Sequence, residues 1–135
     1  MRPLREALTD DPPCEVLLEW VDGCHELDRK IYLDLLEAER AKTIDEIAAT
    51  IDRNRSTAYR AVRRLHETGY LTREQVSYDT GGYCYRFAAV DPDTVAASLR
   101  ERIERYYRDL DELVEEFRCQ YGSGDQKSGK SSGAS

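Results

Sequence analysis

Five arginines crowd one short stretch of the chain and carry its strongest chemical signal. No Asp or Glu interrupts residues 53–64, which hold Arg53, Arg55, Arg60, Arg63 and Arg64. Guanidinium groups bind phosphates and carboxylates through paired, planar hydrogen bonds. The cluster therefore predicts either an anionic partner or ion pairs with acids from elsewhere in the chain.

The charge of the whole chain is segregated around this stretch. The 135 residues include 27 acidic and 20 basic ones, for a net charge of −7. Residues 14–52 sum to −7, whereas residues 53–90 sum to +4. A local positive segment in an acidic protein favours a local anionic partner, and double-stranded DNA is the one we expect.

Other chemistries find less support. The four cysteines fit no closed zinc set, so we expect no metal site and no cofactor, while oxidant sensing by a thiol stays open; they are Cys14, Cys24, Cys84 and Cys119. The stretch 124–131 matches the nucleotide-binding pattern G-x-x-x-x-G-K-S, but it lacks a strand before it and a helix after it. With no isolated carboxylate pair in apolar surroundings either, we expect no enzyme.

Composition also bears on the compartment. No apolar stretch approaches the ~18 residues of a membrane span, so no membrane partner is expected. Residues 1–6 lack the apolar segment of a secretory signal, which predicts the cytoplasm. Sixteen of the bases are Arg and four are Lys. An acidic chain with many arginines and few lysines resembles proteins that stay hydrated in molar salt. The alternative is an acidic protein from a mesophilic organism.

The elements that must position the arginines follow from periodicity and capping signals. Apolar spacing predicts helices over 14–23 and 25–40. Thr43 and Glu46 form a T-x-x-E capping box for a helix that ends near residue 52, and Asn54 caps a helix over 55–68 that ends at Gly69. Strands over 70–78 and 83–88 flank a turn, and a long helix covers 92–120.

This order predicts a mostly α fold with a small β-hairpin, of the α+β class: a winged helix-turn-helix. We divide it into an N-terminal segment (1–13), the winged helix-turn-helix (14–90), a dimerisation helix (91–121) and a disordered Gly/Ser-rich tail (122–135).

The helix over 55–68 separates its residues into two faces at 100° per residue. Ala58, Ala61, Val62 and Leu65 share one face, so the polar side chains opposite are available for a DNA major groove. We predict contacts from Asn54, Arg55, Ser56, Thr57, Tyr59, Arg60, Arg63 and Arg64. A solvated face is the alternative, but Glu67 is the only acid of this helix that could pair with these arginines. In the turn and wing we predict contacts from Thr43, Arg53, Tyr78, Thr80, Gly81, Gly82, Tyr83 and Arg86.

The last predicted helix has a heptad pattern. Its apolar residues recur every three or four positions and are Leu99, Ile103, Tyr106, Leu110, Leu113 and Phe117. We predict that two copies of the chain pair along this seam; packing against the helix over 14–23 of the same chain is the alternative.

The segment from Thr43 to Arg73 (TIDEIAATIDRNRSTAYRAVRRLHETGYLTR) resembles winged-helix transcription regulators of the MarR/TrmB type. In those families the stretch matching Arg55–Arg60 lies on the recognition helix, and Gly69–Leu71 matches the step into the wing. Together with the acidic, arginine-rich composition, residues 14–121 are similar to haloarchaeal members. The resemblance implies a homodimer that regulates transcription as oxidants change, with inorganic cations at the DNA interface as our added expectation. The alternative function is a winged-helix protein-interaction module without specific DNA binding.

Overall fold

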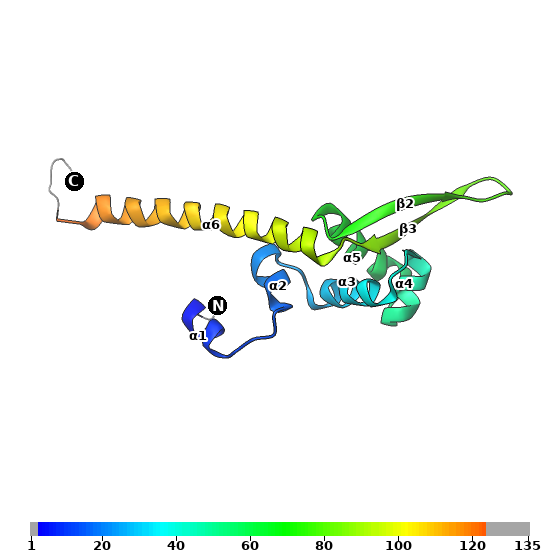
Figure 1. Ribbon diagram of the computed structural model, residues 1–135, viewed down its shortest axis with the longest axis horizontal. Coiled ribbons are helices and arrows are strands. Elements are labelled where there is room, and N and C mark those ends of the chain that lie inside the picture. The colour runs from blue at the N-terminus through cyan, green and yellow to red at the C-terminus, as the bar shows by residue number, and fades with distance from the viewer. Residues whose placement is uncertain (1–2, 124–135) are drawn as a thin grey trace. The chain divides into compact units, whose positions relative to one another are not determined.

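The computed structural model describes residues 3–123, and the chain forms two compact units that divide after Ala96 (Figure 1). The elements of the first unit are α1 (Leu4–Thr9), α2 (Val16–Asp22), α3 (Glu26–Ala38), β1 (Lys42–Thr43), α4 (Ile44–Ile51), α5 (Arg55–Glu67), β2 (Leu71–Ser77) and β3 (Tyr83–Ala89). The last helix, α6 (Pro92–Tyr121), begins in the first unit and makes up most of the described part of the second.

Apolar faces of three helices and the base of the hairpin make the core of the first unit. The largest fully buried side chains there are those of Ile31, Val62, Leu65 and Tyr70, each at 1% exposure or less. Two buried alanines, Ala58 and Ala61, present no bulk on the inner face of α5, which allows α4 to pack closely against it. Figure 1 shows α3, α4 and α5 grouped beside the base of the β2–β3 hairpin. The predicted α+β winged-helix fold is confirmed.

The sheet has three antiparallel strands in the order β1-β3-β2. In the hairpin, Leu71 pairs with Ala89 and Ser77 with Tyr83. Gly81 and Gly82 form the turn with φ angles of 92° and 84°, a backbone conformation that residues with a side chain rarely adopt. The prediction of a two-stranded sheet was incomplete, because Lys42 and Thr43 pair with Phe87 and Arg86. Two residues are too short a run for an alternating pattern to be visible in the sequence.

The N-terminal region also differs from expectation. The sequence predicts no helix or strand in the N-terminal segment 1–13, but Leu4–Thr9 forms a helix that buries none of its residues. The next helix begins at Val16, two residues later than predicted, because a turn follows Pro13. The predicted tail begins at Gly122, directly after α6; its residues 124–135, which include the nucleotide-binding pattern, lie outside the described residues.

Candidate nucleic-acid interface

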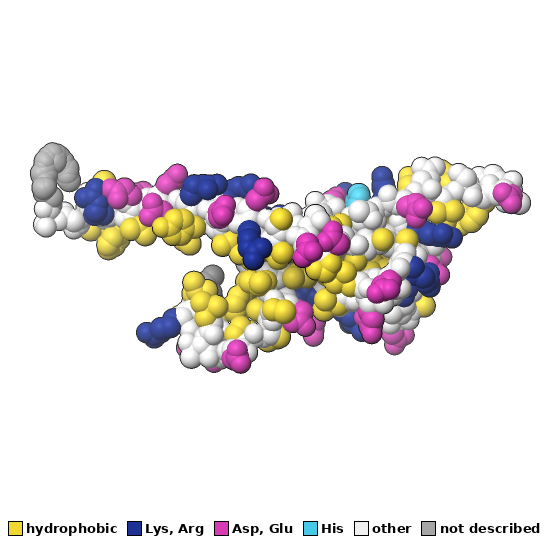
Figure 2. Space-filling model, in the orientation of Figure 1, with side chains coloured by type: hydrophobic (Ala, Val, Ile, Leu, Met, Phe, Trp, Pro, Cys, Tyr) yellow, Lys and Arg dark blue, Asp and Glu magenta, His cyan; other side chains and the backbone are white. Residues whose placement is uncertain are grey.

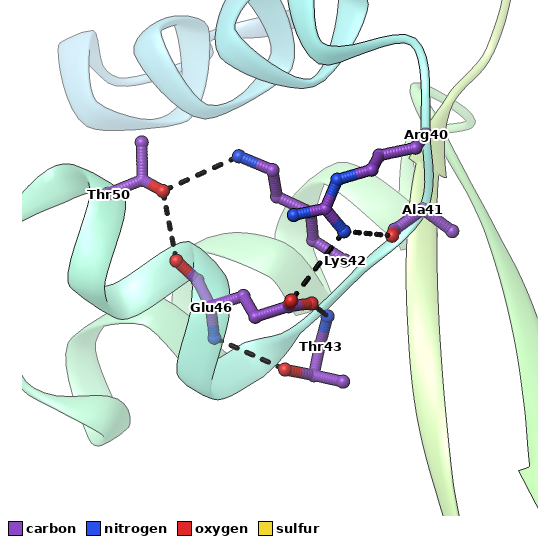
Figure 3. A network of polar contacts seen from close by, with 6 residues as sticks. All are labelled: Arg40, Ala41, Lys42, Thr43, Glu46 and Thr50. Atoms are coloured by element: carbon purple, nitrogen blue, oxygen red, sulfur yellow. Dashed lines mark hydrogen bonds and ion pairs between the residues drawn. The ribbon is translucent and has the colours of Figure 1, made fainter.

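The entry to the helix-turn-helix is held by the predicted capping box. The Thr43 N–H donates to Glu46 Oε1 (2.9 Å), and the Glu46 N–H donates to Thr43 Oγ1 (3.2 Å). The hydrogen bond from the Thr43 N–H stabilises the ionised Glu46 carboxylate, and the positive charge of Arg40 adds to this effect. Together they hold the pKa of Glu46 below its usual value. Figure 3 shows the surrounding network, in which Lys42 Nζ also donates to the Thr50 hydroxyl. Thr43, a predicted DNA contact, therefore also fixes the first turn of α4.

The turn between α4 and α5 has the conformation that its residues favour. Asp52 ends α4 in the left-handed region (φ 56°), which Asp tolerates better than most residues. Asn54 then caps α5, with its Oδ1 accepting from the Thr57 N–H at 2.8 Å. The two helices are thus joined through Asp52–Asn54, as the sequence predicted.

The two faces of α5 are as the helical wheel predicts. Ala58, Ala61, Val62 and Leu65 are buried, whereas the polar residues opposite are exposed: Ser56, Tyr59, Arg60 and Arg63. Tyr59 has 50% of its surface exposed, although it is a large aromatic residue. This side of α5 therefore presents arginine and tyrosine side chains outward.

Two of the exposed arginines form ion pairs with acids. Arg55 Nη1 lies 2.5 Å from Asp45 Oδ1, and Arg63 Nε lies 3.0 Å from Glu67 Oε2. Reasoning from the sequence found Glu67 but gave Arg55 no acid, because Asp45 lies ten residues earlier, on α4. Both pairs are exposed on both sides, so water screens them and an incoming phosphate can compete for the guanidinium groups.

The environment of Arg64 is different. Its Nε and Nη2 donate to the two carboxylate oxygens of Asp28, at 3.0 and 2.7 Å. Asp28 is 2% exposed, and it also accepts from the His25 N–H at the start of α3. Arg64, a predicted DNA contact, is therefore bound to α3, and Asp28 is a residue that sequence reasoning missed. The signal was present, since Asp28 shares a helix face with Ile31, Tyr32 and Leu35.

The remaining arginines of the cluster have no such partner. Across residues 3–123, neither Arg53 nor Arg60 forms an ion pair with an acid, and Arg60 Nη2 lies 3.5 Å from the Thr57 hydroxyl on its own helix. Within the described part of the chain, two of the five arginines are unpaired, two form exposed pairs and one is bound to a buried carboxylate. The open positive charge of α5 is thus concentrated on its outer face.

An aromatic groove lies between the hairpin, α5 and the start of α4. It encloses about 560 Å³ and is lined by Thr43, Ile44, Asp45, Arg55, Tyr59, Tyr78, Tyr83, Cys84, Tyr85 and Phe87. The structure thus brings the predicted wing residues Tyr78 and Tyr83 to one groove with Tyr59 and Arg55 of α5. Tyr85 was not predicted to be part of this surface. The remaining predicted wing residues, Thr80, Gly81, Gly82 and Arg86, are exposed on the hairpin.

The cysteines differ in exposure. Cys14 and Cys119 are exposed, Cys84 is half-buried and Cys24 is buried, and each is a free thiol. Burial, with the nearby Asp28 and Asp22 carboxylates, raises the pKa of Cys24 from 9.0 to about 11. No three His, Cys, Asp or Glu side chains within residues 3–123 are arranged to hold a metal ion. In the same residues, no helix is both long and apolar enough to cross a bilayer.

The helix α6 has an exposed apolar stripe. Of the predicted seam, Leu99 is buried at 8% exposure, but the other residues range from 42% to 66%: Ile103, Tyr106, Leu110, Leu113 and Phe117. Tyr107, Val114 and Tyr121, at 62% or more, widen the stripe. An apolar surface of this length on a charged helix is typical of a protein–protein interface.

Comparison with known proteins identifies related chains. Residues 18–93 match the family model described as "Sugar-specific transcriptional regulator TrmB". The uncharacterised Methanocaldococcus jannaschii protein MJ1503 is 34% identical over 101 residues, which cover 75% of this chain and 76% of that protein. A second uncharacterised protein of that organism, MJ1082, is 32% identical over 104 residues, 77% of this chain and 85% of that one.

Solved structures share the fold. A possible transcriptional regulator from Methanosarcina mazei superposes with a TM-score of 0.70 at 21% identity, over 76% of this chain and 87% of that one. The Staphylococcus aureus protein MepR, as an F27L mutant bound to an oligodeoxyribonucleotide, superposes with a TM-score of 0.50 at 13% identity, over 84% and 77% of the two chains. At these identities the likeness concerns the winged-helix fold.

Proposed function

The chain belongs to the TrmB family of transcriptional regulators, which are not enzymes, and on that premise we propose that it binds specific DNA sequences as a homodimer. DNA binding is assigned to residues 14–90, with α5 in the major groove and the β2–β3 hairpin as the wing. Dimerisation is assigned to residues 91–121.

The outer face of α5 is the observation that carries the proposal. Arg60 is exposed, has no acidic partner within residues 3–123, and lies one turn from the exposed Arg63. Arginine is the side chain best suited to guanine, because it can donate to O6 and N7 together. Positive charge that no acid of residues 3–123 neutralises favours an anionic partner, so we prefer DNA binding to the alternative of a protein-interaction module.

The groove beside α5 supports the same orientation. Tyr59, Tyr78 and Tyr83 are each half exposed or more, and hydroxyl groups of this kind donate to phosphate oxygens. Arg53 and Asn54, immediately before α5, are exposed as well. We propose that these residues contact the phosphates of the DNA backbone and that the outer face of α5 contacts the base edges.

The acidic charge of the chain leads to a proposal about salt. The net charge of −7 is doubled in a dimer, so the acids beside the DNA repel phosphates unless cations lie between them. We assign inorganic cations to that boundary and a salt-rich cytoplasm as the working environment. The excess of Arg over Lys supports the haloarchaeal assignment.

The proposal includes a response to oxidative stress through the cysteine thiols. Thiolates react with oxidants, and the raised pKa of Cys24 keeps that thiol protonated. Cys14 and Cys119 are exposed and would therefore carry the response. DNA binding before and after peroxide treatment, in the native chain and in a Cys14→Ser/Cys119→Ser variant, tests this assignment; an equal response of both proteins would refute it.

Replacing Arg60 with Ala tests DNA binding itself. A preferred site is first selected from a random DNA pool, and affinity is then measured on that site and on random DNA. If Arg60 contacts a base, the loss is about 1–3 kcal/mol on the preferred site and smaller on random DNA. Arg5→Ala, at an exposed arginine of α1 outside both the proposed DNA interface and the α6 seam, is the matched control and should leave both affinities unchanged.

Equal losses on the two DNAs would assign Arg60 to the phosphates. If the Arg60→Ala variant kept full affinity for both DNAs, Arg60 would not contact DNA, and the proposal that the outer face of α5 binds it would be refuted.

A further inference from the structure

The apolar stripe of α6 lies along one side of a helix whose charges are unevenly distributed. Figure 2 shows hydrophobic side chains gathered along one edge of α6 and charged side chains along the other. Residues 100–108 carry four arginines and two glutamates, whereas residues 109–117 carry five acids and no base. Within this stretch of α6, residues 100–108 therefore form a basic half and residues 109–117 an acidic half.

The stripe is long enough to require a helical partner. Between Ile103 and Tyr121 the exposed apolar residues recur at every turn, and each is at least 42% exposed. The spacing of 4, 3, 4, 3 and 4 from Leu99 to Phe117 is a heptad, the repeat that allows two helices to interlock over several turns. A second copy of α6 supplies a matching stripe of the same length.

The charges distinguish the two orientations that a pair of α6 helices can adopt. In a parallel pair, the acidic half of one helix lies beside the acidic half of the other. In that orientation the residues facing Asp109 and Glu116 across the seam are Val114 and Tyr121, so no opposite charges meet. In an antiparallel pair each basic half lies beside an acidic half, and charges at the edge of a seam set helix orientation.

One antiparallel register also matches the apolar residues. If the helices cross at Arg108, then Ile103 faces Leu113 of the second copy and Tyr106 faces Leu110. Arg102 and Glu116 each precede a seam residue, Ile103 and Phe117, so both lie along the same edge of the seam. In this register Arg102 of each copy faces Glu116 of the other. The like-charged contact in this register, Asp109 with its own copy, lies beside Arg108.

We propose that two copies of the chain pair through α6 in antiparallel orientation, with Arg102 of each copy beside Glu116 of the other. This proposal rests on the homodimer proposed above and adds the orientation and register of its seam. The pairing buries Ile103, Tyr106, Leu110 and Leu113 from both copies.

Disulfide trapping tests the orientation. In a background with Cys14, Cys84 and Cys119 replaced by Ser, two chains are prepared separately, one with Ile103→Cys and one with Leu113→Cys. After mixing and mild oxidation, antiparallel pairing gives a disulfide between the two different chains and little within either preparation alone. The buried Cys24 is retained. A parallel pair would instead link each variant to its own copy, which would overturn the proposal.

A charge exchange tests the register without altering the apolar seam. Arg102→Glu or Glu116→Arg alone should raise the dimer dissociation constant on the order of tenfold at the lowest salt at which the chain is folded, and the double variant should recover most of the loss. Positions 102 and 116 lie about 21 Å apart along one helix, so their coupling must cross between copies. Additive effects of the two changes would overturn the register.

Light scattering separates failure of this proposal from failure of the proposed function. A dimer with like-to-like disulfides retains the homodimer and rejects the antiparallel seam. A monomer at all concentrations, with intact helix content by circular dichroism, rejects both the dimer and the seam.

Discussion

Replacing Arg64 with Met is expected to destabilise the first unit although Arg64 is part of the arginine cluster. The guanidinium of Arg64 forms two hydrogen bonds with Asp28, whose side chain is only 3% exposed. Met preserves most of the aliphatic stem but leaves the buried carboxylate without its cation. The same carboxylate accepts from the His25 N–H, so the start of α3 is affected as well.

The expected cost follows from the burial of the two partners. Removing one partner of a fully buried ion pair costs about 3–5 kcal/mol, whereas exposed pairs contribute about 0–1 kcal/mol. The Arg64 side chain is 42% exposed, so water already screens one side of the pair. We therefore expect a loss of about 2–3 kcal/mol in the free energy of unfolding, or a decrease in Tm on the order of 10 °C.

Urea unfolding followed by circular dichroism measures this loss, with Arg63→Met as the matched control on the same helix. The pair between Arg63 and Glu67 is 65% and 61% exposed on its two sides, so the control should unfold as the native chain does. The double variant Asp28→Asn/Arg64→Met should lose less than the sum of its single changes, because the two residues form one pair. Equal stability of the Arg63→Met and Arg64→Met variants would refute the structural role of Arg64.

Further predictions concern DNA affinity, acid, alkali and truncation. The slope of log affinity against log salt should be shallow or positive across the molar range, because cation uptake offsets counterion release; a slope on the order of −5 in a titration from roughly 0.5 M would contradict this. Stability should fall as pH decreases through the lowered pKa of Glu46, whose folded-state proton affinity is reduced by the Thr43 N–H, and Glu46→Gln should lessen that dependence in urea unfolding at several pH values. As pH rises from 9.0 to about 11 the unfolded chain loses the Cys24 proton before the folded one, so stability should fall over that interval, and less so with Cys24→Ala. Truncation before Leu110 should give monomers with weak DNA binding; a truncated chain that remains dimeric in light scattering would place the dimer interface elsewhere.

Local interactions account for what could be read directly from the residues. The capping box of Thr43 and Glu46, the Asn54 cap and the inner face of α5 each depend on residues within one or two turns of one another. Helix periodicity and capping act over such distances, so these elements and the winged-helix order were predictable. The same holds for the outward orientation of Arg60 and Arg63, since burial of Ala58 and Ala61 determines it.

Contacts between segments distant in the chain were decided only by the tertiary structure. Asp45 reaches Arg55 across the helix-turn-helix, and Asp28 reaches Arg64 across 36 residues. Lys42 and Thr43 become a strand because β3 lies beside them. Periodicity places Asp28 on the buried face of α3, but the identity of each partner has no local signature, because an ion pair or a two-residue strand needs only proximity, which packing creates. The sequence by itself therefore determined which residues face outward on α5, and the packing of α3, α4 and β3 against one another decided which of those arginines remain unpaired.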